Sequence, residues 1–143
     1  MKKVIALDLG TKTCGIAVSD VLGIAHGREN FRFVEGAYRQ CLAHVYEVMQ
    51  GENIDEVALG YPLNMDGSAG ERAQSAERFK KELLEMMPNI QVSLVDERLT
   101  TVMANRRLLE ADISRKKRHK VIDQQAAVVI LESYINSKNG GSL

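Results

Sequence analysis

The chain has 143 residues, a length that suits one compact domain and is too short for two full lobes around a cleft. Hydrophobic residues make up 45% and charged residues 27%, which argues against disorder, and no apolar run reaches the roughly 18 residues of a membrane span. Because the formal net charge is zero, the chain as a whole is not a polycationic nucleic-acid binder, and a binding surface would need local clustering of charge.

The amino terminus and the two cysteines bear on the cellular compartment. Met1, Lys2 and Lys3 lead directly into a strand pattern, without the apolar region and cleavage site of a signal peptide, which predicts a cytoplasmic location. Cys14 and Cys41 lack metal-ligand spacing. They are predicted to be free, reduced thiols in the core.

The first third of the chain predicts three strands and a helix. Residues 4–9 (VIALDL) and 14–20 (CGIAVSD) are apolar on nearly every position, as expected for strands covered on both faces, and a short hairpin connection joins them. A third strand is expected within residues 24–34. Apolar residues at helical spacing follow in residues 38–49.

The remaining elements alternate between strand and helix. Residues 55–62 (DEVALGYP) read as a strand that Pro62 stops, and SAGE, starting at Ser68, matches a capping box for a helix that runs to about Met87. Later elements are a strand at 90–96 and helices at 101–111 and 123–135. This order predicts a mixed α/β sheet with helices on both faces, in a single domain over residues 1–138 with a flexible tail at 139–143.

Four acidic residues stand where strands end or a helix starts. Asp8 ends a buried strand, Asp96 and Glu97 end another, and Asp123 opens the last predicted helix. Each alone has a structural explanation, as a turn residue or as an acid favoured by a helix dipole. Because side chains alternate along a strand, only one of Asp96 and Glu97 is expected on the face of Asp8.

Acids from separate elements can meet at one edge of the sheet, beyond the carboxyl ends of the strands. Three converging carboxylates repel one another unless divalent cations lie among them, and two Mg²⁺ or Mn²⁺ ions held by oxygen ligands form a clamp used in phosphodiester cleavage. The histidines His26, His44 and His119 are scattered and do not suggest zinc.

Positive charge is concentrated in residues 115–120 (RKKRHK), between two predicted helices. Such a run is usually a solvated loop or helix face, and by composition alone that interpretation is favoured over phosphate binding.

Four segments together resemble one protein family. ALDLGTKTCGIAVSD, ALGYPLNMDGSAGERA, VDERLTT and SRKKRHKVIDQQAAVVILESYI look like the signature blocks of the YqgF/RuvX family of bacterial pre-16S rRNA processing nucleases or Holliday junction resolvases. The resemblance runs from about Val4 to Tyr134. It implies an RNase H-like, RuvC-like fold with a mixed five-stranded sheet flanked by helices, and a two-metal-ion nuclease acting on phosphodiester bonds in structured nucleic acid.

The resemblance also implies roles for individual residues. The catalytic and metal-binding acids of the family fall on Asp8, Glu97 and Asp123, with Asp96 in reserve for Glu97, and the expected cofactor is Mg²⁺ or Mn²⁺. The resemblance reverses the preference for the basic run, which now favours backbone binding. The expected nucleic-acid contacts are Lys12, Arg98, Arg115, Lys116, Lys117 and Arg118. Arg98 has an alternative role as the partner of an acid.

Several alternatives stay open. The first block also resembles the phosphate loop of the actin and sugar kinase superfamily, but this chain lacks the length for a second lobe and a second glycine-rich block. A non-catalytic RNA-binding scaffold is a third class. The expected substrate is the 5′ end of pre-16S rRNA, with ribosomal assembly intermediates as partners. The alternative substrate is branched DNA, which would call for a homodimer rather than a monomer. Tyr61 stands where members of the YqgF/RuvX family usually carry an aliphatic residue. Residues 23–35 match no signature of that family.

Overall fold

The computed structural model describes residues 2–98 and 115–139, with side chains from residue 125 onward in the second range. The described elements, in chain order, are β1 (Ile5–Leu9), β2 (Thr13–Ser19), β3 (Ala25–Arg32), α1 (Tyr38–Glu52), β4 (Glu56–Tyr61), α2 (Glu71–Met86), β5 (Gln91–Asp96) and α4 (Arg115–Lys138). The strands and α1 match the sequence predictions within a few residues. The helix predicted at 101–111 lies outside the described residues.

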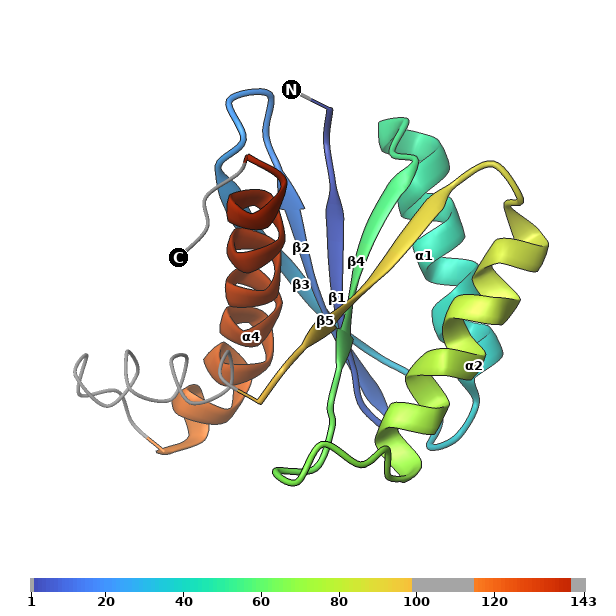
Figure 1. Cartoon of the computed structure of the whole chain (residues 1–143), viewed down its shortest axis with the longest axis vertical. Coiled ribbons are helices and arrows are strands. Elements are labelled where there is room, and N and C mark those ends of the chain that lie inside the picture. Colours follow the sequence, from blue (N-terminus) through green and yellow to red (C-terminus); the bar gives the residue numbers. More distant parts are fainter. Residues whose placement is uncertain (1, 99–114, 140–143) are drawn as a thin grey trace.

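The five strands form one mixed sheet in the order β3-β2-β1-β4-β5 (Figure 1). β2 is antiparallel to both β1 and β3, whereas β4 is parallel to both β1 and β5. The carboxyl ends of β1, β4 and β5 therefore meet at one edge of the sheet. The prediction of a mixed five-stranded sheet is confirmed, and residues 23–35 contribute the edge strand β3.

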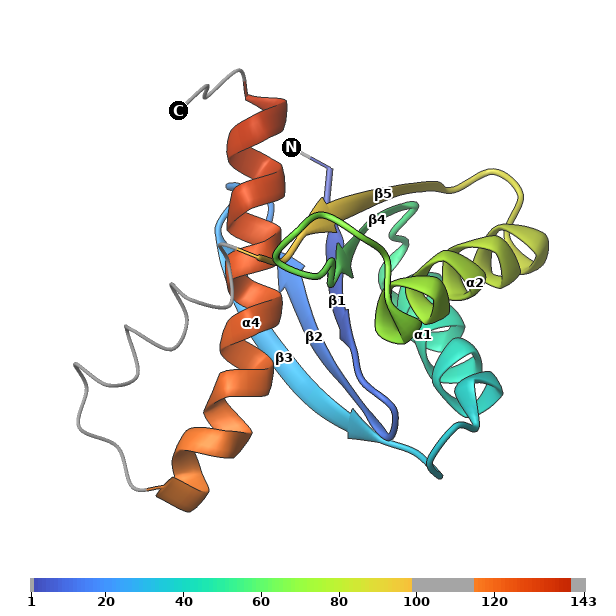
Figure 2. The same ribbon diagram turned by 60° about the horizontal axis from the view of Figure 1, so that its bottom comes forward.

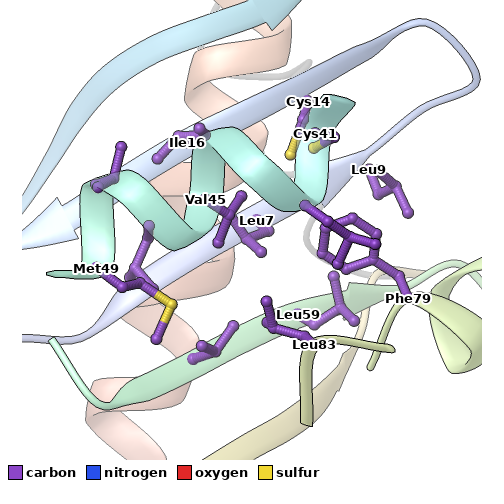
Figure 3. Close-up of a cluster of buried hydrophobic side chains, with 14 of the residues drawn as sticks. Leu7, Leu9, Cys14, Ile16, Cys41, Val45, Met49, Leu59, Phe79 and Leu83 are labelled. Carbon is purple, nitrogen blue, oxygen red and sulfur yellow. The ribbon is translucent and has the colours of Figure 1, made fainter. Parts of the chain in front are cut away.

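Helices cover the sheet on both sides, α1 and α2 on one face and α4 on the other (Figures 1 and 2). Under α1 and α2 lies the larger buried cluster, in which side chains such as Leu7, Val45 and Leu59 pack together (Figure 3). A smaller cluster under α4 contains Ala127 and Ile130. Burying apolar surface on both faces is the main stabilising term for such a sheet.

Side-chain alternation along β1 divides its residues between the two clusters. Ile5, Leu7 and Leu9 belong to the cluster under α1 and α2, whereas Ala6, and Val4 just before the strand, belong to the cluster under α4. The same alternation assigns Asp8 to the α4 face, at the carboxyl end of the strand.

The start of α2 differs from the predicted capping box. The helix begins at Glu71 behind Gly70, without a side-chain hydrogen bond to its first turn. The Ser68 hydroxyl instead donates to Asp66 Oδ1 at 2.6 Å and accepts a bond of 3.0 Å from the Asn64 side chain. The prediction was wrong because a nearby carboxylate competes for the serine hydroxyl within the loop.

The predicted start of the last helix was also wrong. α4 already includes Arg115 and continues to Lys138, so the basic run is helical and Asp123 lies inside the helix rather than at its first turn. Arginine and lysine are good helix formers, and residues 115–122 contain no glycine or proline that would stop a helix.

The two cysteines are free and buried, as predicted. Cys14 and Cys41 lie side by side between β2 and α1 (Figure 3). The hydrogen bond with Cys41 and burial raise the pKa of the Cys14 thiol well above its usual range. Among the described residues, none of the helices has the length and apolarity needed to cross a membrane.

A buried polar cluster anchors the C-terminal end of α4 to the sheet. Glu56, at the start of β4, is 5% exposed and accepts hydrogen bonds from the Tyr134 hydroxyl and, at 2.6 Å, from Lys138 Nζ. Burial raises the pKa of Glu56, but the bonds from Lys138 and Tyr134 outweigh it, so the net shift is downward. A carboxylate in this setting stabilises the fold only while it is ionised.

Glu56→Gln is expected to destabilise the chain by roughly 1–3 kcal/mol near neutral pH, because Lys138 and Tyr134 lose an ionised acceptor. Since the folded pKa of Glu56 is lowered, its contribution is present above the unfolded pKa and is lost as pH falls through the folded pKa. Urea unfolding between pH 7 and pH 3 checks this. The gap between wild type and variant closes on acidification, and exposed Glu85→Gln serves as the control. A gap that stays constant with pH would contradict the assignment.

Candidate active site

Asp8 and Glu97 come together at the edge where β1, β4 and β5 end. Asp8 is half-buried, and its antiparallel partner on β2 is Gly15, which adds no side chain beside it. Glu97 follows β5 directly and is 6% exposed. Its carboxyl group is hydrogen-bonded to that of Asp8. The structure thus brings together two of the three acids named from the sequence.

Backbone pairing sets the direction of Glu97. The Glu97 amide donates to the Tyr61 carbonyl at 3.1 Å, which continues the contact between β4 and β5 past the last residue of β5. Asp96, one residue earlier, is exposed and receives three side-chain bonds from Arg98, one from Nη2 at 2.6 Å and two from Nε at 3.0 and 3.1 Å. As predicted, only one of the two neighbouring acids shares a site with Asp8.

Gly60 on β4 makes room for the Glu97 side chain. A β-carbon at this position would lie 2.7 Å from Glu97 Cδ and 2.8 Å from Ile130 Cδ1. The carboxyl group and α4 both pack against the bare backbone of the strand, and any larger residue has to displace one of them. The sequence alone does not reveal this function of Gly60, because it depends on a close contact between distant segments of the chain.

The electrostatics of the pair follow from its burial. Burial, the negative charge of Asp8 and the hydrogen bond between the two groups raise the pKa of Glu97 to about 9, against an opposing effect of Arg72. At neutral pH in the absence of a cation, Glu97 is therefore protonated and donates its hydrogen bond to Asp8. A pair of carboxyl groups this close needs a shared proton or a bound cation to be stable.

Arg72, in the first turn of α2, approaches the same edge from the other face of the sheet. Its Nη2 donates to the Leu9 carbonyl at 3.0 Å, one residue after Asp8. Its charge also favours the ionised form of Glu97. The sequence alone gives no signal for this role of Arg72, because its partner lies 63 residues away along the chain.

The third predicted acid, Asp123, lies in the helical part of α4 whose side chains are outside the described residues. Asp123 precedes Ala127 by four residues and Ile130 by seven, so the helical repeat places its backbone on the stripe of α4 that carries these two buried residues. A metal-ligating role for Asp123 stays a prediction. Among the described residues no group of three or more His, Cys, Asp or Glu side chains could hold a metal ion.

The predicted basic contacts differ in their surroundings. Lys12 is exposed in the connection between β1 and β2. Arg98 pairs with Asp96, which bears out its alternative role, and the hydrogen bonds from Arg98 lower the pKa of Asp96. Residues 115–118 form the first described turn of α4. Their contact with nucleic acid stays a prediction.

Similarity to known proteins identifies the family to which the chain belongs. The family RuvX, described as Holliday junction resolvase, matches residues 2–137. The chain belongs to the RuvX family. This RuvX chain is 46% identical over 136 residues to a Staphylococcus carnosus protein named "Putative pre-16S rRNA nuclease", covering 94% of this chain and 96% of that protein. A Bacillus subtilis protein of the same name is 44% identical over 138 residues, with 96% and 99% covered.

A solved structure agrees with the fold. Thermus thermophilus RuvC in complex with a Holliday junction substrate superposes with a TM-score of 0.61 at 17% identity, covering 98% of this RuvX chain and 97% of that chain. The RuvC-like, RNase H-like fold predicted from the sequence is therefore confirmed, as is the family resemblance.

Proposed function

We propose that this RuvX chain is a metal-dependent nuclease that processes the 5′ end of pre-16S rRNA. The observation that carries the proposal is the pair of hydrogen-bonded carboxyl groups, Asp8 and Glu97, at the carboxyl ends of β1 and β5. Paired acids at this edge of an α/β sheet are suited to binding a cation and a phosphate ester. Close relatives that carry the name of a pre-16S rRNA nuclease support the choice of RNA.

The acid pair fits Mg²⁺ or Mn²⁺ by its chemistry. Both described donors are carboxylate oxygens, which suit hard cations, and Mg²⁺ is commonly bound through one or two carboxylates together with substrate phosphates. Asp8 and Glu97 would hold the cation, and Asp123 is proposed as a third ligand. The chemistry that such ions supply is activation of water and stabilisation of charge on the departing oxygen.

The proposed reaction is hydrolysis of a phosphodiester bond. Water attacks the phosphorus, the bond from phosphorus to the 3′ oxygen breaks, and the products carry a 5′ phosphate and a 3′ hydroxyl. The protein side chains hold the phosphate beside the acids, and burial of Glu97 limits access of bulk solvent to one side of the pair. Lys12, Arg115, Lys116, Lys117 and Arg118 are proposed to bind the backbone outside the acid pair.

The second candidate function is resolution of four-way DNA junctions. It is favoured by the description of the matching family as Holliday junction resolvase, whereas the superposition on a RuvC structure at 17% identity concerns the fold alone. A resolvase makes two symmetric cuts and would act as a homodimer, whereas a trimming nuclease can act as a monomer.

A single domain over residues 1–138, with a tail at 139–143 and a cytoplasmic location, remains part of the proposal.

The test compares the two substrates directly. Purified protein is incubated with a precursor rRNA 5′-end fragment or a synthetic four-way DNA junction, in Mg²⁺, in Mn²⁺ and in EDTA. We expect cleavage of the RNA in both metals and none in EDTA. Paired symmetric cuts in the junction, with the RNA intact, would make the resolvase function primary. If neither substrate is cleaved in Mg²⁺ or in Mn²⁺, a non-catalytic RNA-binding or nucleotide-binding module would be favoured.

A further inference from the structure

Arg72 occupies a position that helix electrostatics disfavours. It is the second residue of α2, and the amino-terminal turn of a helix carries partial positive charge, which favours acids such as the neighbouring Glu71 and opposes cations. Departures from a local rule of this kind are expected mainly at functional sites. The position therefore calls for an explanation beyond helix stability.

The contacts of Arg72 fix one part of its side chain and leave the rest accessible. Nη2 donates to the Leu9 carbonyl at 3.0 Å, at the last residue of β1. A guanidinium group has five N–H donors in a planar fork, so this bond leaves donors for another ligand. Arg72 is exposed, and it forms no ion pair with the side chains that the structure describes, those of residues 2–98 and 125–139.

The anchored guanidinium lies close to the candidate acids. Leu9 follows Asp8 directly, and the positive charge of Arg72 attracts the carboxyl group of Glu97. A neutral donor would satisfy the Leu9 carbonyl equally well, so that bond does not explain the need for a charge. A bound divalent cation would neutralise the acids, and the arginine charge would then be available to an anion.

We propose that Arg72 binds a backbone phosphate of the nucleic-acid substrate beside the Asp8–Glu97 pair. This inference rests on the proposed nuclease function and names a substrate-contacting residue of that site. The planar fork matches two phosphate oxygens, which is the reason to prefer arginine over lysine where a phosphate has to be oriented as well as attracted. The bond to Leu9 holds the fork in place before the substrate binds.

The test measures the salt dependence of RNA binding without cleavage. Wild type, Arg72→Gln, Arg72→Lys and Arg78→Gln are titrated in Mg²⁺, at several concentrations of monovalent salt, onto a cleavage-resistant analogue of the precursor rRNA 5′-end fragment. Arg78 is an exposed arginine on the same helix and controls for loss of one charge. Removing one phosphate contact is expected to make the plot of log K against log salt less steep by about 0.7 to 0.9 and to weaken binding roughly tenfold.

Arg72→Lys is expected to keep most of the slope while lowering the cleavage rate in Mg²⁺, because it retains charge and loses the fork. Arg78→Gln is expected to behave as wild type. If Arg72→Gln unfolds more easily but keeps the wild-type slope, Arg72 is only structural and the inference is wrong. If wild type neither binds nor cleaves the RNA, the proposed function fails and the role of Arg72 fails with it.

Discussion

Asp8→Asn is expected to lower the rate of RNA cleavage by on the order of 10³-fold or more, because a neutral amide cannot replace the carboxylate that holds the divalent cation. The substitution is nearly the same size, and Asp8 is half-buried beside Gly15, so no clash is introduced. Single-turnover cleavage of the precursor fragment in saturating Mg²⁺ measures the loss. Full activity of the variant would exclude the proposed mechanism.

Stability separates this loss from unfolding. Asp8 places a negative charge beside the buried Glu97, and that charge is one reason why the pKa of Glu97 is raised. Asparagine keeps an oxygen that accepts the hydrogen bond from protonated Glu97, so Asp8→Asn is expected to unfold at about the same urea concentration as wild type.

Gly60→Ala is expected to reduce cleavage by on the order of 10²-fold while the chain stays folded. The added methyl group would lie 2.7 Å from Glu97 Cδ and 3.0 Å from Glu97 Oε1, so the carboxyl group has to move away from Asp8. Overpacking of this kind costs about 1–3 kcal/mol in stability. Single-turnover rates and urea unfolding are measured on the same preparation.

A second substitution separates the effect of Gly60→Ala on stability from its effect on activity. The new methyl group also lies 2.8 Å from Ile130 Cδ1, an atom that Ile130→Val removes. The double variant is expected to recover stability but not activity, because Glu97 is still displaced. Gly51→Ala, at a helical glycine with nothing within 4 Å of the new methyl group, is the control and should leave activity unchanged. Wild-type activity in Gly60→Ala would show that the position of Glu97 is unimportant.

The parts of the fold that follow local rules could be predicted from the sequence. The apolar run of β1 and the helical spacing in α1 each identify an element without knowledge of its neighbours. Strand alternation also predicted that only one of Asp96 and Glu97 joins Asp8. Side-chain direction within a strand is fixed by the backbone, so this inference needs no tertiary contact.

The capping-box prediction failed because of competition for a hydroxyl group, and two site residues were missed because their roles depend on distant contacts. Ser68 matches a capping box, but Asp66 takes its hydroxyl, a choice that the motif does not reveal. Gly60 and Arg72 gain their roles from Glu97 and Leu9, which lie far away in the chain. A glycine in a strand and an arginine in a helix are common, and only the assembled sheet edge shows what they contact.

Calorimetric titration with Mn²⁺ tests the central claim most directly, on wild type and Asp8→Asn at pH 7 in buffers of different ionisation enthalpy. Because the pKa of Glu97 is raised to about 9, it carries a proton that a cation has to displace. Wild type is expected to bind Mn²⁺ with release of about one proton, and Asp8→Asn to bind far more weakly. Equal Mn²⁺ binding by the two proteins, or binding by wild type without proton release, would contradict a metal site at Asp8 and Glu97.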